Sequence, residues 1–146
     1  MIDYELLINW LNVTRIIRND SLLNDKFENK ITYNEVLVLA AIFNEGHPYS
    51  SFGDILKSTK MLKSQLNRTI NSLEKKEYII RKIDEEDKRC QKVKMTNEGE
   101  SILSEIKETM LKVVRNFIDV IGEEDSKTLC DIFGKIIDKQ NLLIKE

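Results

Sequence analysis

Residues 60–99 read KMLKSQLNRTINSLEKKEYIIRKIDEEDKRCQKVKMTNEG, and this stretch decides the fold of the chain. Its first part has apolar residues spaced by four, four and three positions, which share one face of a helix: Leu62, Leu66, Ile70 and Leu73. The opposite face is polar and basic and has no acid: Lys60, Ser64, Asn67, Arg68, Asn71 and Lys75. The spacing predicts an amphipathic helix over 60–76. Taken alone, this outer face is as typical of an ordinary solvated surface helix as of a helix that binds a partner.

A β-hairpin is expected directly after this helix. Residues 78–83 are β-branched and aromatic, and apolar residues alternate with lysines over 92–95. The crowded acidic and basic residues between these strands then form the tip of the hairpin. A pair of helices followed by a β-hairpin is the element order of a winged helix-turn-helix, in which the second helix enters the major groove of DNA.

Capping patterns define the helices before this stretch. Thr32 and Glu35 have the spacing of a capping box, and the apolar run that follows ends at Gly46 and Pro48. Ser51 and Asp54 repeat the capping pattern and open a short helix that ends near residue 58. A further helix is expected over 3–23, with an apolar stripe wide enough for two partners.

Two long helices are expected after the hairpin. Thr96 is a candidate N-cap, and Gly122 ends the first of these helices. Apolar residues recur in steps of three and four along that helix: Leu103, Ile106, Met110, Val113, Phe117 and Val120. A last helix carries Leu129, Ile132, Phe133, Ile136 and Ile137. These stripes exceed the internal need of one small domain and favour an obligate homodimer over the rival interpretation, an intrachain bundle.

The predicted fold is therefore mainly α with a small β-hairpin, a winged helix-turn-helix whose long terminal helices form a dimerisation bundle. We divide it by role into an N-terminal dimerisation helix (1–30), a DNA-binding part (31–98) and C-terminal dimerisation helices (99–146). A chain of 146 residues that is 41% apolar and 33% charged is expected to make one compact domain overall.

Composition excludes most catalytic and metal chemistry. His47 is the one histidine, and it lies in a Gly-His-Pro loop, so zinc sites and histidine triads lack their parts. Cys90 and Cys130 are far apart and form no C-x-x-C pair, which argues against a disulfide framework. Nucleotide-binding and hydrolase motifs do not occur. We expect no enzyme, metal or cofactor, no membrane association, and a cytoplasmic location, because no export signal or membrane span is seen.

The charge is unevenly distributed along the chain. Residues 60–94 hold eleven lysines and arginines against six acids, whereas the remainder holds 12 bases against 19 acids. A local excess of five positive charges is thus hidden in a net charge of −2. Phosphate contacts depend on local charge, so the acidic pI does not exclude double-stranded DNA as a partner.

The quoted stretch resembles the multiple-antibiotic-resistance regulator (MarR) family of bacterial transcription factors. The family has an Asp-x-Arg at the hairpin, followed by an apolar-Thr-x-x-Gly that leads into a long helix. Asp87, Arg89, Met95, Thr96 and Gly99 fill these places in order. The resemblance extends over nearly the whole chain, because the flanking helices fit the family's dimerisation elements.

The resemblance implies a homodimeric regulator, a repressor, that binds a pseudo-palindromic operator. Arg89 would enter the minor groove of DNA, and Asp87 would brace it by a charge-assisted hydrogen bond. An exposed hairpin salt bridge is the alternative for this pair. The expected DNA contacts are Lys60, Lys63, Ser64, Gln65, Asn67, Arg68, Asn71, Lys88 and Arg89. A second class of function is a winged-helix dimer that serves as a protein-interaction module without DNA binding.

Two residues depart from the family pattern. Leu62 stands near the place of a capping Ser or Thr, so we expect the recognition helix to begin earlier, capped by Ser58 or Thr59. Glu77 replaces a helix-ending glycine that is common in the family, so we expect a less sharp turn into the hairpin.

The effector is weakly encoded in the sequence. The family default is a small lipophilic or phenolic ligand between the DNA-binding and dimerisation parts, where Trp10 and Tyr33 are candidate lining residues, although such aromatics are more often core. Cys90 is a redox candidate, because neighbouring cations would lower the pKa of its thiol; an incidental exposed thiol is the alternative.

Overall fold

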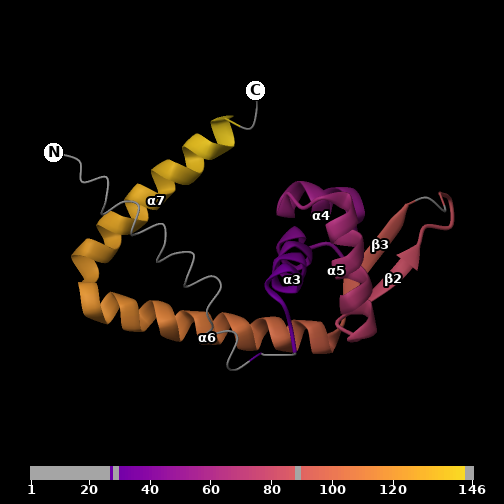
Figure 1. The fold of residues 1–146 in the computed structure, drawn as a ribbon, viewed down its shortest axis with the longest axis horizontal. Helices are drawn as coiled ribbons and strands as arrows, with labels where there is room; N and C mark the ends of the chain where they lie inside the picture. Colours follow the sequence, from indigo (N-terminus) through magenta and orange to yellow (C-terminus); the bar gives the residue numbers. More distant parts are fainter. Residues whose placement is uncertain (1–26, 28–29, 88–89, 144–146) are drawn as a thin grey trace. The chain divides into compact units, whose positions relative to one another are not determined.

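A computed structural model describes residues 27, 30–87 and 90–143. Figure 1 shows a mainly helical chain with one small sheet, which confirms the predicted fold class. Contacts among residues divide the chain into two compact units, Met1–Ile106 and Lys107–Glu146, where the sequence led us to expect one domain. The helix expected over 3–23 lies outside the described residues, and the division into three segments by role stays a prediction.

The first described helix, α3 (Tyr33–Glu45), begins at the predicted capping box. Thr32 Oγ1 accepts from the backbone N–H of Glu35, and Oε2 of Glu35 accepts from the N–H of Thr32. Gly46 ends α3 in the left-handed conformation. Ser51 Oγ accepts from the N–H of Asp54 and caps α4 (Phe52–Thr59). The N-caps predicted at Thr32 and Ser51 are therefore confirmed.

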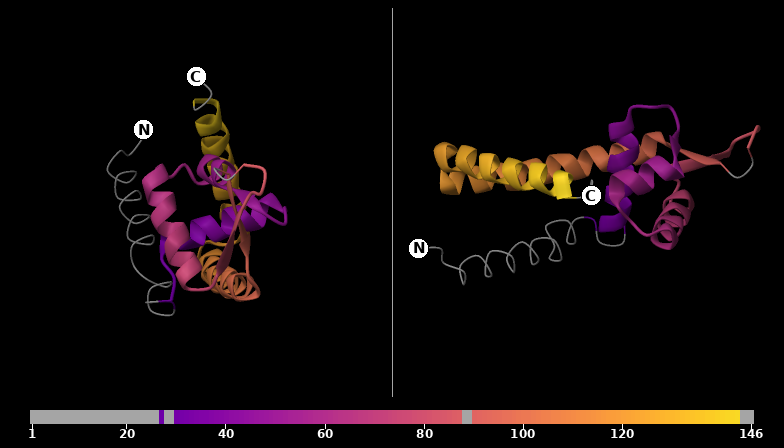
Figure 2. Two further views of the ribbon diagram at one scale, coloured as in Figure 1. Left: turned by 90° about the vertical axis from the view of Figure 1, so that its right-hand side faces the viewer. Right: turned by 90° about the horizontal axis from the view of Figure 1, so that it is seen from above.

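The sheet has three strands in the order β1-β3-β2, all antiparallel. β2 (Ile79–Ile83) and β3 (Gln91–Met95) form the predicted hairpin, whose far end extends beyond the helices α3, α4 and α5 (Lys63–Lys75; Figure 2). β1 (Ser50–Ser51) pairs with β3 and was not predicted. A two-residue strand leaves no alternation in the sequence by which to recognise it.

The core of the first unit lies between the sheet and the helices. Besides Phe27, it is built from side chains of the three helices α3, α4 and α5, of β2 and β3, and of the first turns of the helix that follows: Phe27, Val38, Leu39, Ala41, Ile42, Ile55, Leu66, Ile70, Leu73, Ile79, Val93, Met95, Ile102, Leu103 and Ile106. Full burial of a large aliphatic side chain stabilises a fold by about 1.5–3 kcal/mol. This core fixes the recognition helix and the hairpin to one scaffold.

The helix α6 (Asn97–Ile121) leaves the hairpin through the predicted cap. Thr96 Oγ1 accepts from the N–H of Gly99 at 3.1 Å, which confirms its N-cap role. Thr96 Oγ1 also donates to the carbonyl of Glu77 at 2.7 Å, so the cap joins both ends of the hairpin. Gly122, at φ +86°, separates α6 from α7 (Glu123–Leu143), as predicted. No described helix is long and apolar enough to cross a bilayer.

Candidate nucleic-acid interface

The recognition helix α5 (Lys63–Lys75) starts later than the sequence led us to expect. Its N-cap is Leu62, whose side chain makes no capping hydrogen bond. The expectation of an earlier start capped by Ser58 or Thr59 is wrong, because α4 continues through Thr59 and Lys60 closes it at φ +56°. Leu62 is also not on the buried face of the helix: its extended backbone leaves it 73% exposed.

The outer face of α5 carries most of the predicted DNA contacts. Lys63, Ser64, Asn67, Arg68 and Asn71 are exposed, and Gln65 is half-buried. Leu66, Ile70 and Leu73 on the opposite face are fully buried. Within the described residues no carboxylate pairs with Lys63 or Arg68, so both cations are available to an external anion.

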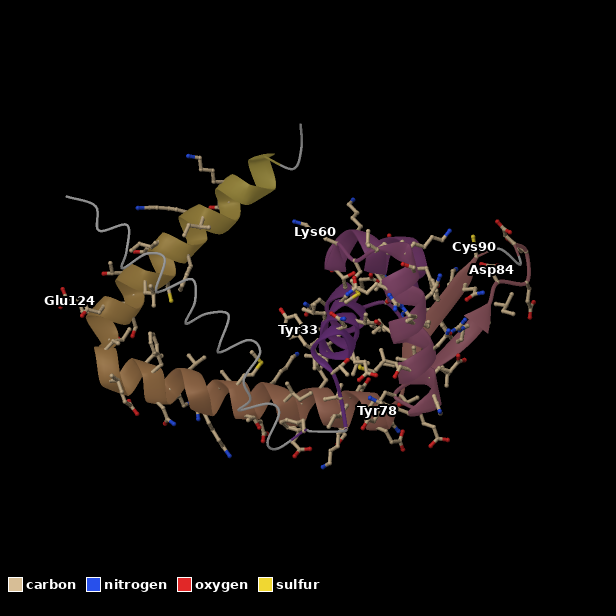
Figure 3. The ribbon with its side chains drawn as sticks, in the orientation of Figure 1. Tyr33, Lys60, Tyr78, Asp84, Cys90 and Glu124 are labelled. Carbon is tan, nitrogen blue, oxygen red and sulfur yellow. The ribbon has the colours of Figure 1, made fainter. Side chains whose placement is uncertain are left out.

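Lys60 lies in the turn between α4 and α5 and not on the outer face of the recognition helix (Figure 3). Its left-handed backbone ends α4, and its N–H donates to the carbonyl of Leu56 at 2.8 Å. The side chain is exposed next to the N-terminus of α5. This cation therefore extends the basic surface beyond the end of the recognition helix.

A buried carboxylate holds the C-terminal end of α5. Glu35 in α3 is 2% exposed, and its Oε2 lies 2.7 Å from Lys76 Nζ, while its Oε1 accepts from Ser72 Oγ at 2.7 Å. The capping box predicted the start of α3, but no spacing pattern pointed to this long-range pair. Lys76, one of the eleven basic residues counted over 60–94, is thus engaged inside the protein.

Competing effects set the pKa of Glu35. Burial raises it, and hydrogen bonds from Lys76, Ser72 and the backbone of Thr32 lower it by more, so the pKa lies below its ordinary value. The carboxylate is therefore charged at neutral pH, and Lys76 faces a full negative charge.

Arg81 in β2 joins the hairpin to the recognition helix. Its Nη2 lies 2.6 Å from Asn71 Oδ1 and 3.2 Å from Glu74 Oε2, and its Nη1 lies 3.0 Å from Gln91 Oε1. Its guanidinium also lies over the Phe52 ring, 5.8 Å from the centroid. From the sequence, Arg81 is only one of the basic residues counted over 60–94. The one hint that its side chain contacts the rest of the protein is its position as the third residue of a strand that follows a helix.

The hairpin tip is organised by Asp84 and Asp87. Asp84 Oδ1 accepts from the N–H of Glu86 at 2.9 Å, and its Oδ2 lies 3.4 Å from Lys92 Nζ. The backbone hydrogen bond and then the lysine hold the pKa of Asp84 below its ordinary value. Lys88 and Arg89 lie outside the described residues, so the predicted bracing of Arg89 by Asp87 stays a prediction.

The pKa of Cys90 shifts in the direction opposite to the one that the redox hypothesis requires. Cys90 lies at the tip with Asp84 (Figure 3), and its Sγ donates to Asp87 Oδ2 at 3.5 Å. This hydrogen bond and the negative charge of Asp87 raise the pKa of the thiol above its ordinary value. A raised pKa lowers the thiolate fraction, so the geometry favours an unreactive thiol over a redox sensor.

The turn from α5 into β2 is as sharp as a glycine would make it. Glu77 adopts φ +62°, and the N–H of Tyr78 donates to the carbonyl of Leu73 at 3.0 Å. This left-handed closure is the usual one at helix C-termini. The less sharp turn expected from the absence of glycine is therefore wrong, and a glutamate bears the backbone strain instead.

Residues 24–106 match the model of the family described as transcriptional regulator SarA/Rot. The chain belongs to the SarA/Rot family. These winged-helix proteins are MarR-like transcriptional regulators and not enzymes, so the resemblance drawn from residues 66–99 is confirmed. The match spans α3 to the first turns of α6 and includes the whole candidate interface.

One relative and two solved structures match this SarA/Rot regulator over nearly the whole chain. The uncharacterized HTH-type transcriptional regulator YpoP of Bacillus subtilis (strain 168) is 26% identical over 141 residues, which cover 96% of this chain and 95% of YpoP. Wild-type MarR from E. coli, in its apo form, is 22% identical, with a TM-score of 0.71 over 93% of this chain and 97% of MarR. Bordetella bronchiseptica BpsR, described for regulation of its DNA binding by 6-hydroxynicotinic acid, is 16% identical, with a TM-score of 0.68 over 91% of this chain and 96% of BpsR. The two solved structures share the fold of this chain.

The effector residues proposed from the sequence are only partly described. Trp10 lies outside the described residues. Tyr33, in the first turn of α3, is 51% exposed, so its side chain is accessible to a ligand (Figure 3). Among the described side chains no three His, Cys, Asp or Glu residues gather as a metal site.

Proposed function

We propose that this SarA/Rot regulator is a cytoplasmic homodimeric repressor that binds a pseudo-palindromic operator in double-stranded DNA. The recognition helix α5 enters the major groove, where Lys63, Ser64, Gln65, Asn67, Arg68 and Asn71 contact bases and phosphates, with Lys60 at its N-terminal side. Lys88 and Arg89 of the wing reach the adjacent minor groove, and Asp87 braces Arg89.

One observation carries this proposal: a fully buried apolar face fixes α5 while its opposite face leaves Lys63 and Arg68 exposed. A helix diameter of about 10–12 Å fits the major groove of B-DNA. Exposed cations on a rigid helix bind phosphate by releasing counterions. The geometry thus suits a long polyanion better than a small acidic ligand.

The second unit supports the homodimer. Large apolar side chains of α6 and α7 remain about half exposed or more in the single chain: Met110, Leu111, Val114, Phe117, Val120, Ile132 and Ile136. Exposed apolar surface on this scale is typical of a protein–protein interface. A twofold dimer presents two copies of α5 to two half-sites, which is why the operator is expected to be pseudo-palindromic.

A small lipophilic or phenolic effector would release the repressor from DNA. BpsR, which shares this fold, is described for regulation of its DNA binding by a hydroxylated aromatic acid. Trp10 and Tyr33 are the aromatic residues proposed to contact such a ligand. Such an effector would release DNA by binding more tightly to a form of the dimer in which the spacing of the two recognition helices no longer matches the two half-sites.

The test is selection of genomic DNA fragments by the purified wild type, Arg68→Ala, Arg89→Ala and a matched control, Arg115→Ala on α6. We expect wild type and control to enrich one pseudo-palindrome with equal affinity. Arg68→Ala and Arg89→Ala should weaken binding, each lowering the slope of log affinity against log salt by about 1. If the wild type enriches no sequence, or if its affinity for DNA is independent of salt, the protein-interaction module replaces this proposal.

A further inference from the structure

Arg81, on β2, contacts three other elements of the DNA-binding unit. From β2 it reaches Asn71 and Glu74 on α5, Gln91 on β3 and the Phe52 ring at the start of α4. Its side chain is 23% exposed, so these contacts exchange less readily with water than surface pairs do. Asn71 is exposed on the outer face of α5, next to Arg68 and Asn67 in the predicted contact set.

The chemistry of this contact fixes the orientation of the Asn71 amide. A guanidinium has only donors, so only the amide oxygen of Asn71 can face Arg81 across 2.6 Å. The amide nitrogen must then point away from Arg81. A charge-assisted hydrogen bond of this length is about twice as strong as a neutral one, which makes the orientation persistent.

We propose that Arg81 is a positioning residue for DNA recognition: it presents the N–H donors of Asn71 outward and holds the wing at a fixed distance from α5. This inference rests on the proposed function. A free asparagine reads adenine with both its oxygen and its nitrogen. With its oxygen turned to Arg81, Asn71 instead donates to an acceptor on DNA, either a base atom such as guanine O6 or N7, or a phosphate oxygen.

The arrangement also links the wing to the recognition helix, the two parts of the domain proposed to contact DNA. Arg81 and Gln91 lie on the two strands of the wing, and Asn71 and Glu74 lie on the recognition helix. A wing that moves freely would lose orientational entropy when helix and wing bind neighbouring grooves together. Arg81 reduces this loss of entropy because it fixes the wing to the recognition helix before DNA binds.

The experiment uses the full-length protein and the operator obtained by selection. Affinity is measured for the operator and for a set with each base pair of one half-site replaced in turn. The variants are Arg81→Met, Arg81→Lys, Asn71→Ala and the double variant Arg81→Met with Asn71→Ala. Ile80→Ala is the matched control, because it changes an exposed side chain next to Arg81 on β2 that takes no part in the contacts above. Thermal unfolding of each variant separates loss of fold from loss of recognition.

If Asn71 donates to a base, Arg81→Met and Asn71→Ala should lose discrimination at the same base pair, by about tenfold, and the double variant should lose no more. Arg81→Lys should lose this discrimination as well, because a single ammonium cannot replace the planar guanidinium and its several N–H donors. If Asn71 donates to a phosphate, both single variants should weaken all operators equally, again without further loss in the double variant. Ile80→Ala should keep wild-type discrimination.

Additive effects of the two substitutions, or a folded Arg81→Met that binds every operator as wild type does, would overturn the inference while leaving the repressor in place. If the wild type selects no operator at all, the proposed function fails, and this inference fails with it. The two failures are therefore distinguishable.

Discussion

Lys76 Nζ lies 2.7 Å from Oε2 of Glu35, and this contact ties the C-terminal end of the recognition helix to the first turn of α3. The same carboxylate accepts from Ser72 Oγ and from the backbone N–H of Thr32, so one buried side chain both caps one helix and holds another. Lys76 is 29% exposed, so water partly solvates the ammonium while the carboxylate depends on its protein partners.

Glu35→Gln is expected to destabilise the fold by about 2 kcal/mol at neutral pH, because the charge-assisted bond to Lys76 is lost. The folded pKa of Glu35 lies below its ordinary value of 4.5. Its contribution is therefore complete above that value and is lost as pH falls through the lower folded pKa. Urea unfolding from pH 7 to pH 3 should show a steeper acid loss in wild type than in Glu35→Gln. Glu108→Gln, at an exposed position of α6, is the control and should keep the wild-type profile. Equal profiles for all three proteins would contradict the prediction.

Leu62→Thr is expected to stabilise the fold by about 1 kcal/mol, because a hydroxyl at the N-cap accepts from the first backbone N–H groups of α5. Leu62→Ala is the control: it removes a side chain that is 73% exposed without adding a cap, so stability should hardly change. Urea unfolding measures both. An unchanged Leu62→Thr would mean that these N–H groups already have partners.

Glu77→Gly is expected to stabilise the fold by about 1 kcal/mol. The residue sits at φ +62°, where a side chain is strained and glycine is not. The hydrogen bond from Thr96 is to the backbone carbonyl and survives the change. Lys75→Gly in the last turn of α5 should instead cost about 1 kcal/mol. Thermal unfolding of the two variants should therefore move in opposite directions, and a shared sign would refute the strain at residue 77.

Asp87→Asn is expected to make Cys90 more reactive. Asp87 raises the pKa of the thiol through a hydrogen bond and its charge, so its neutralisation lowers that pKa and increases the thiolate fraction at pH 7 to 8. Alkylation by iodoacetamide, measured in a Cys130→Ser background, should quicken a few-fold, with the pH profile displaced to lower pH. Glu86→Gln, one residue before Asp87, serves as the control for the general charge of the tip. An unchanged or slower rate in Asp87→Asn would show that Asp87 does not raise the pKa of this thiol.

Local signals predicted the fold well, because caps act within a few residues of the chain. Thr32 and Thr96 each begin a helix through bonds to residues three positions later, and such pairs can be read directly from spacing. The start of α5 escaped prediction because Leu62 has the right period for the core but an extended backbone that turns it outward. Arg81 and Glu35 escaped for a different reason: their partners lie 10, 37 and 41 residues away, and helix and strand periods carry no information about such contacts.

Gly99→Ala is expected to be among the most damaging single substitutions, and it explains the glycine of the apolar-Thr-x-x-Gly signature. A Cβ at residue 99 would lie 2.2 Å from the carbonyl oxygen of Tyr78 and 2.8 Å from Met95 Cγ, closer than atoms can approach. The first turn of α6 would have to leave the hairpin, at a cost of about 3 kcal/mol.

Gly134→Ala in α7 is the matched control for that substitution. Apart from its chain neighbours and the backbone of its own helix, no atom of the described residues lies within 4 Å of its added Cβ, so the higher helix propensity of alanine should stabilise α7 by about 1 kcal/mol. Thermal unfolding should show a marked loss for Gly99→Ala and a small gain for Gly134→Ala. If Gly99→Ala unfolded like wild type, the close approach of α6 to Tyr78 would not exist in solution, and the wing would be anchored to α6 by other contacts.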